Sequence, residues 1–100
     1  MLAHSVFFTL KDRSESARQK LVSQCRTYLS DHPGIAYFYV GALAEGFERD
    51  VNDRDFDVAL TIIFEDRASH DAYQAAETHH KFIDEAHADW AQVRVFDSES

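Results

Sequence analysis

The fold is decided by one stretch of the chain, FDVALTIIF at residues 56–64. Side chains of a β-strand alternate between two faces, and one face of this stretch takes the large apolar residues Phe56, Val58, Leu60, Ile62 and Phe64. The opposite face takes Asp57, Ala59, Thr61 and Ile63. Residues 2–10, LAHSVFFTL, show the same period, with one face formed by Leu2, His4, Val6, Phe8 and Leu10. We predict two strands of one sheet, although both faces of residues 2–10 are apolar enough to turn toward a core.

A helix is predicted between these strands, over about residues 14–30. Ser14 or Ser16 can cap its start, and its apolar stripe recurs at helical spacing through Ala17, Leu21, Cys25 and Tyr28. The sequence DHPG at residues 31–34 ends it, because proline cannot continue a helix.

A second helical stretch follows residues 56–64. It opens at Asp66 or Ser69 and runs to about His87, with a restart near Thr78. Two further strands are predicted, at residues 35–43 and 92–96.

The resulting order is βαββαβ. With right-handed crossovers this order gives a ferredoxin-like α+β sandwich, in which one four-stranded antiparallel sheet carries both helices on one face. The chain has 100 residues and shows no repeats or linkers, so we expect a single domain over residues 1–100.

The net charge, the length of the apolar runs and the cysteine count exclude several classes of protein and partner. Eighteen acidic residues against ten basic ones give a net charge of −8, which argues against nucleic acid and anionic membranes as partners. Apolar runs fall short of the roughly 20 residues of a membrane span, and the start of the chain lacks a signal-peptide pattern. The single cysteine excludes an internal disulfide. We expect a small, soluble, cytoplasmic domain.

The strand at residues 35–43, IAYFYVGAL, has no side suited to water. Phe7 and Ile63 add further apolar groups to the weaker faces of the neighbouring strands. Two helices can cover only one face of a sheet, and large exposed apolar patches are rare on monomers. We therefore expect a homodimer in which the open sheet faces of two copies meet.

Three stretches and the last strand resemble a known family. They are AHSVFFTL with KD after it at residues 3–12, DFDVALTIIFE at 55–65, AYQAAETHHKF at 72–82, and VRVFD at 93–97. On these residues the chain resembles the stress-responsive A/B-barrel domain family of the dimeric α+β barrel superfamily. The resemblance implies a dimeric barrel. Some relatives are cofactor-independent polyketide cyclases that use a tyrosine and histidines of these segments, others assemble into larger rings, and many have no established activity.

His4, Tyr73 and His79 form the predicted catalytic set, which the resemblance places at a pocket between sheet and helices. A histidine can remove a proton alpha to a carbonyl because its ordinary pKa lies near physiological pH. The tyrosine hydroxyl can donate to the developing enolate oxygen. No metal, nucleotide or other cofactor is required. The alternative is that all three are core side chains satisfied by their neighbours.

We expect this pocket to bind a small, largely apolar or aromatic molecule. Its predicted lining consists of Val6, Phe8, Leu60, Ile62, Phe82 and Trp90. Two alternatives stay open: a cofactor-independent cyclase or lyase that acts through an enolate, and a stress protein whose function is its own assembly.

A second polar cluster falls on one face of the later helix, at Glu77, His80, Asp84 and His87. Residues one helical turn apart can share a transition metal, but a solvated helix face has the same pattern, and we assign no metal site there.

Three remaining features have simpler interpretations. Cys25 lies in an apolar stripe, which favours a packing role over a nucleophilic one. The charged loop at residues 45–55 could fold over a pocket mouth with Phe47, or be solvated only. The three glycines match no nucleotide-binding spacing: Gly34, Gly41 and Gly46.

Overall fold

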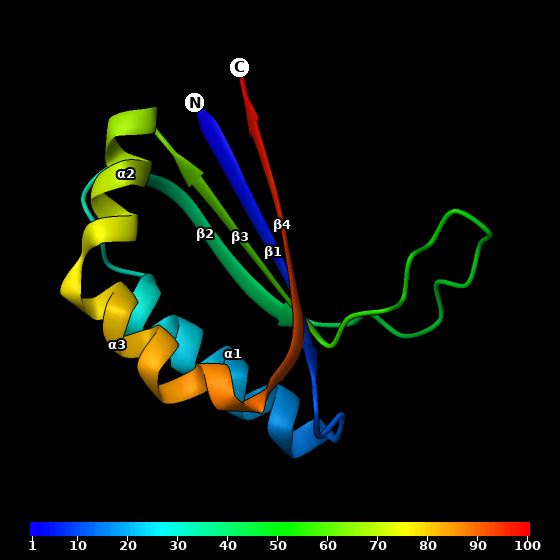
Figure 1. The fold of residues 1–100 in the computed structure, drawn as a ribbon. Helices are drawn as coiled ribbons and strands as arrows, with labels where there is room; N and C mark the ends of the chain where they lie inside the picture. Colours follow the sequence, from blue (N-terminus) through cyan, green and yellow to red (C-terminus); the bar gives the residue numbers. More distant parts are fainter.

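The computed structural model describes residues 1–100 and shows the predicted order, with the second helix divided in two. Its elements are β1 (Leu2–Leu10), α1 (Glu15–Leu29), β2 (Ile35–Ala42), β3 (Val58–Phe64), α2 (Arg67–Ala75), α3 (Glu77–Ala86), a 3₁₀ turn η1 (His87–Asp89) and β4 (Trp90–Glu99). The strands form one antiparallel sheet in the order β2-β3-β1-β4, and the helices lie on one side of it (Figure 1). The ferredoxin-like α+β sandwich is thereby confirmed. No helix combines the length and hydropathy that crossing a bilayer requires.

Strand β4 is longer than the predicted residues 92–96. It pairs with the whole of β1, from Leu2 opposite Glu99 to Leu10 opposite Trp90. The two ends of the chain therefore lie beside each other at one end of the sheet (Figure 1). The added pairing satisfies backbone groups that a short strand would leave exposed along β1.

Short polar side chains fix where the first two helices begin. The Oγ atom of Ser14 accepts a hydrogen bond from the Ala17 N–H at 3.2 Å, so Ser14 rather than Ser16 caps α1. Asp66 caps α2 in the same way, because its carboxylate accepts from the Ser69 N–H at 2.8 Å.

The face of β1 that carries His4 turns toward the helices. All five of its side chains are buried: Leu2, His4, Val6, Phe8 and Leu10. The matching face of β3 and the stripe of α1 complete one continuous core, to which Tyr73, Phe82 and Ala86 are added from α2 and α3. The structure therefore settles the orientation of β1 that the sequence left open.

Strand β3 begins at Val58, two residues later than predicted. The Phe56 ring packs edge-on against the ring of Phe7, at 5.1 Å between centroids, on the sheet face away from the helices. Asp57, which the alternation placed outside, is fully buried. The strand period fails at these two positions because a polar network holds the Asp57 side chain before the strand starts.

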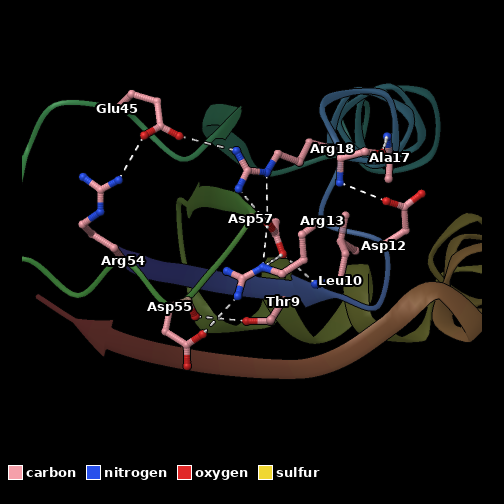
Figure 2. A network of polar contacts seen from close by, with 11 residues as sticks. Thr9, Leu10, Asp12, Arg13, Ala17, Arg18, Glu45, Arg54, Asp55 and Asp57 are labelled. Atoms are coloured by element: carbon pink, nitrogen blue, oxygen red, sulfur yellow. Dashed lines mark hydrogen bonds and ion pairs between the residues drawn. The ribbon is translucent and has the colours of Figure 1, made fainter.

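That network surrounds one carboxylate (Figure 2). Asp57 accepts hydrogen bonds from the Leu10 N–H at 2.8 Å, from Arg13 Nε at 3.1 and 3.2 Å, and from Arg18 Nε at 2.9 Å. Burial by itself would raise the pKa of this carboxyl, but the hydrogen bonds from Leu10, Arg18 and Arg13 outweigh it and lower the pKa below its usual range. Glu45 extends the network by bridging Arg18 and Arg54.

The open face of the sheet is aromatic. Tyr37, Tyr39 and Phe96 are exposed there to 62%, 47% and 56%. The loop between β2 and β3 leaves the sheet on this open side, away from the helices (Figure 1). Phe47 in this loop is exposed, and no residue of the loop lines the two cavities between sheet and helices, so the loop does not cover them.

Replacing Asp57 by asparagine should lower the free energy of unfolding by roughly 2–4 kcal/mol at pH 7, because it leaves two arginines facing an uncharged group. Urea unfolding at fixed protein concentration measures this difference. Because the pKa of Asp57 is lower in the folded than in the unfolded protein, the charged carboxylate stabilises the fold at any pH above its unfolded-state pKa of about 3.9. This stabilisation is lost as the pH falls through the folded-state pKa. The difference between the two proteins should accordingly shrink in acid.

Asp55→Asn is the matched control, because the Asp55 side chain is exposed and its one ion pair is long, with Oδ1 3.8 Å from Arg13 Nη1. Its effect should stay within about 0.5 kcal/mol. An equal loss in both variants would mean that general charge balance, not the buried carboxylate, stabilises the junction.

Candidate functional site

The three residues predicted to act together do meet. Tyr73 of α2 is buried, and its ring centroid lies 4.9 Å from that of His79 and 6.0 Å from that of His4, both edge-on. The break between α2 and α3 makes this possible. Ala76 has an extended backbone (φ −67°, ψ 145°), which turns the chain and brings His79 of α3 back beside Tyr73.

Two more histidines, which the sequence interpretation missed, join this group. The His32 ring packs edge-on against Tyr73 at 5.2 Å, and the His70 ring lies 5.1 Å from that of His4. His70 precedes Tyr73 by one helical turn, a spacing that could have shown the pair. His32 had no such signal, because it lies in the turn after α1, where only its neighbour Pro33 was informative.

A pocket of about 180 Å³ opens beside Tyr73 and His79 between the sheet and α3. Five of the six predicted lining residues border it: Val6, Phe8, Leu60, Phe82 and Trp90. Ile62 does not, because it is fully buried in the core. The lining also includes side chains that the sequence did not single out, namely Leu29, Gln74, Ile83, Val93 and Val95.

Two buried polar atoms in this lining have no hydrogen-bond partner. They are Nδ1 of His79 and Nε1 of Trp90. An unpaired buried polar atom costs free energy, so a pocket that holds two of them is suited to a ligand that pairs with them. The indole nitrogen can only donate, whereas the imidazole nitrogen can donate or accept according to its tautomer.

Burial sets the protonation of the two central side chains. It lowers the pKa of His79 to about 4, with smaller contributions from the positive charge of His80, His4 and two further histidines. Burial also raises the pKa of Tyr73 above its usual value. At pH 7 the pocket therefore presents a neutral imidazole and a protonated phenol.

His4 has a carboxylate partner on the neighbouring strand. The His4 Nδ1 atom lies 2.6 Å from Oδ1 of Asp97, and the two residues are directly paired across β1 and β4. The sequence gave no sign of this contact, because the residues are 93 positions apart. A carboxylate in this position fixes the orientation of the imidazole ring.

The four polar side chains on the exposed face of α3 do not converge on a position that a metal ion could occupy. Glu77, His80, Asp84 and His87 are all exposed. His87 Nδ1 lies 2.8 Å from the Ile83 carbonyl oxygen, and Glu77 pairs with Lys81. The one group of three side chains within reach of a single ion is a different set: His4, His70 and Asp97.

Cys25 has the predicted packing role. It is fully buried in the core, and burial raises the pKa of its thiol to about 12. The thiol is therefore protonated and inaccessible at neutral pH, which excludes a nucleophilic cysteine.

A larger cavity of about 360 Å³ lies elsewhere, between the first half of α1 and the start of β4. Its lining is mixed, with Lys11, Lys20, Asp12 and Asp89 among its residues. Gln24, whose Nε2 atom is buried without a partner, borders it. Trp90 borders both cavities, so it separates the polar cavity from the apolar pocket.

Comparison with known proteins gives one family. The family model for the stress responsive A/B barrel domain matches residues 2–100. No curated protein sequence matches the chain.

Solved structures share the fold. A dabb family protein with a ferredoxin-like fold from Mesorhizobium loti has a TM-score of 0.78 and 21% identity, over 99% of this chain and 95% of that one. A dimeric ferredoxin-like protein of unknown function from Thermobifida fusca has a TM-score of 0.79 and 15% identity, over 99% and 90%. The hydroxynitrile lyase from Passiflora edulis has a TM-score of 0.75 and 17% identity, over 97% and 90%.

Replacing His79 by leucine should leave the free energy of unfolding unchanged or raised at pH 7, because its Nδ1 atom has no partner to lose. The folded-state pKa of about 4 lies below the unfolded value of about 6.5. The native protein therefore loses stability as the pH falls between these values, by at most about 1.4 kcal/mol per pH unit from this group. Urea unfolding at pH 7 and at about pH 5 should show the variant's advantage growing in acid.

His80→Leu, on the exposed side of the same helix, is the control and should show no such growth. A loss of about 1–3 kcal/mol in His79→Leu at pH 7 would mean instead that the imidazole makes a stabilising hydrogen bond.

Proposed function

Because this chain belongs to the stress responsive A/B barrel domain family, we propose that it acts as a homodimer that binds a small, largely apolar molecule in the pocket beside Tyr73. The observation that carries the proposal is the pair of unpartnered buried atoms, His79 Nδ1 and Trp90 Nε1, in an otherwise apolar lining. Pockets that recognise small molecules combine apolar walls with a few such polar groups.

The size and chemistry of the pocket define the ligand class. A dry cavity of about 150 Å³ holds one benzene molecule, so about 180 Å³ suits a single ring with a small substituent. The Trp90 indole requires an acceptor on that substituent, and the neutral His79 ring can pair with a second oxygen or hydroxyl. A one-ring phenolic or aromatic carboxylic acid meets these conditions.

A ligand could enter the pocket along its solvent-exposed edge, which β4 forms. Val93 and Val95 of β4 belong to the lining and remain 38% and 50% exposed. They lie at the edge of the sheet, where β4 has no further strand beside it. We place the entrance of the pocket at this edge.

A second copy of the chain would cover the open face of the sheet. Tyr37, Tyr39 and Phe96 leave aromatic surface exposed there, which is uncommon on a protein that works alone. The neighbour from Thermobifida fusca is described as dimeric, which supports the same arrangement here.

Catalysis through an enolate is the second candidate, and one contact favours it. The pairing of His4 with Asp97 at 2.6 Å has the geometry of a base held by an orienting carboxylate, and the neighbour from Passiflora edulis is named a hydroxynitrile lyase. His79 itself, with a pKa of about 4, is a weak base at pH 7. Its low basicity favours binding as the function of His79.

Salicylate is a suitable probe of the pocket. Titration calorimetry should show binding of one molecule per chain, weakened about fivefold in Trp90→Phe and in His79→Leu, because each variant removes one hydrogen bond worth about 1 kcal/mol. Trp90→Phe keeps an aromatic ring in the wall, so its effect isolates the N–H donor.

Gln24→Leu is the matched control, because it removes the unpaired buried donor of the larger, polar cavity instead. Weaker binding in Gln24→Leu alone would place the ligand in that cavity and overturn the proposal. Turnover of an aromatic β-keto thioester that disappears in Tyr73→Phe would favour the enzyme. Particles larger than a dimer, with no binding in any variant, would favour a protein that acts by assembly.

Phe96→Glu should weaken the dimer at least about tenfold, because it places a charge in the centre of the proposed contact face. Light scattering over a concentration series measures the mass. Ala72→Glu, which adds the same charge on the exposed side of α2, should stay dimeric. A parent protein that is monomeric at micromolar concentration would contradict the paired open faces.

A further inference from the structure

We propose that His4, His70 and Asp97 bind one divalent transition-metal ion at the end of the sheet where the two chain termini meet. Their ligand atoms all lie within 4.8 Å of one another. Two imidazoles and one carboxylate are ligands that zinc and related ions prefer. The site goes beyond the proposed function, since neither His70 nor Asp97 belongs to the pocket lining.

The sheet itself holds two of the three ligands. His4 and Asp97 are directly opposite residues of β1 and β4, and their side chains leave the same face. Opposite residues of antiparallel strands keep their Cβ atoms about 5 Å apart, so the imidazole and the carboxylate cannot drift away from each other. Their present separation of 2.6 Å is a hydrogen bond, which an ion bound between the two groups would replace.

The third ligand comes from α2 and is oriented by its own neighbours. His70 Nδ1 lies 3.1 Å from the Asp71 carboxylate, and Nε2 lies 3.5 Å from the Gln74 amide nitrogen. The Asp71 carboxylate keeps the proton on Nδ1, so Nε2 carries the lone pair and accepts the long hydrogen bond from the Gln74 amide, which a metal ion would replace. This carboxylate–histidine arrangement is the usual support of a metal-binding imidazole.

Small side-chain movements complete the coordination. Ligand atoms about 2.0–2.1 Å from a tetrahedral ion lie roughly 3.3 Å from one another, between the closest and the widest separations found here. Asp97 is half-exposed and can make most of this adjustment, while His4 is buried against the rings of Phe64 and Tyr73. Apolar rings on one side of a site limit the access of water.

Three protein ligands leave one position of a tetrahedral ion open. Water or a ligand oxygen can occupy it. His4 also borders the pocket beside Tyr73, so a metal bound to His4 lies next to any molecule held there and could polarise its carboxylate or carbonyl group.

The test uses Zn²⁺ and Co²⁺ alone with the full chain after treatment with a chelator, at pH 7. We expect one ion per chain, and for Co²⁺ the visible absorption of a low-symmetry site. His70→Gln and Asp97→Asn should each weaken binding by about 100-fold, and Asp71→Asn, which changes only the support of His70, by about tenfold. Asp71 and Asp97 are exposed, so these two variants should fold even if His70→Gln does not.

His80→Gln and Asp84→Asn are the matched controls, because they remove the same residue types from the exposed face of α3. They should bind the metal like the parent. Equal affinity in all variants, or a loss confined to the α3 variants, would overturn the site and indicate only loose attraction of cations to an acidic chain. Metal binding and salicylate binding are measured separately, so failure of one leaves the other standing.

Discussion

A carboxylate buried away from water, that of Asp57, is the constraint on which the arrangement of this fold depends. It joins the end of β1, the start of α1 and the entry into β3 through hydrogen bonds to Leu10, Arg13 and Arg18 (Figure 2). A buried carboxylate has to be paired, so these segments are fixed relative to one another. The first residue of β3 is thereby set at Val58, and a slip of one residue would move every side chain of the strand to the other face.

This register of the strands places different kinds of side chain on the two faces of the sheet. On the inner face β1 buries His4 among apolar residues. His70 from the first turn of α2, Tyr73 from its last turn and His79 from the first turn of α3 gather beside it. On the outer face the same strands expose aromatic rings, and the loop between β2 and β3 points away on that side (Figure 1). Recognition of small molecules and association of chains can thus be served by opposite sides of one sheet.

Burial determines the protonation of the two central side chains on the inner face. It lowers the pKa of His79 and raises that of Tyr73, which keeps both groups uncharged and suited to hydrogen bonding. A bound anion would raise the pKa of His79 toward neutrality, so the same pocket could gain basicity only once a charged ligand had entered.

The sequence by itself determined the order of elements and the ferredoxin-like sandwich, and the family resemblance grouped His4, Tyr73 and His79 at one pocket. Apolar periodicity and helix-ending residues are local signals, and the resemblance of residues 72–82 to a family supplied the rest. Only the tertiary structure decided that the His4 face of β1 turns toward the helices and that Phe56 and Asp57 exchange faces. It also decided that Ile62 is buried in the core instead of lining the pocket, and that Asp97 and His70 join His4. These depend on contacts between residues 39 to 93 positions apart, and no local pattern records which distant side chain will satisfy a buried charge or imidazole.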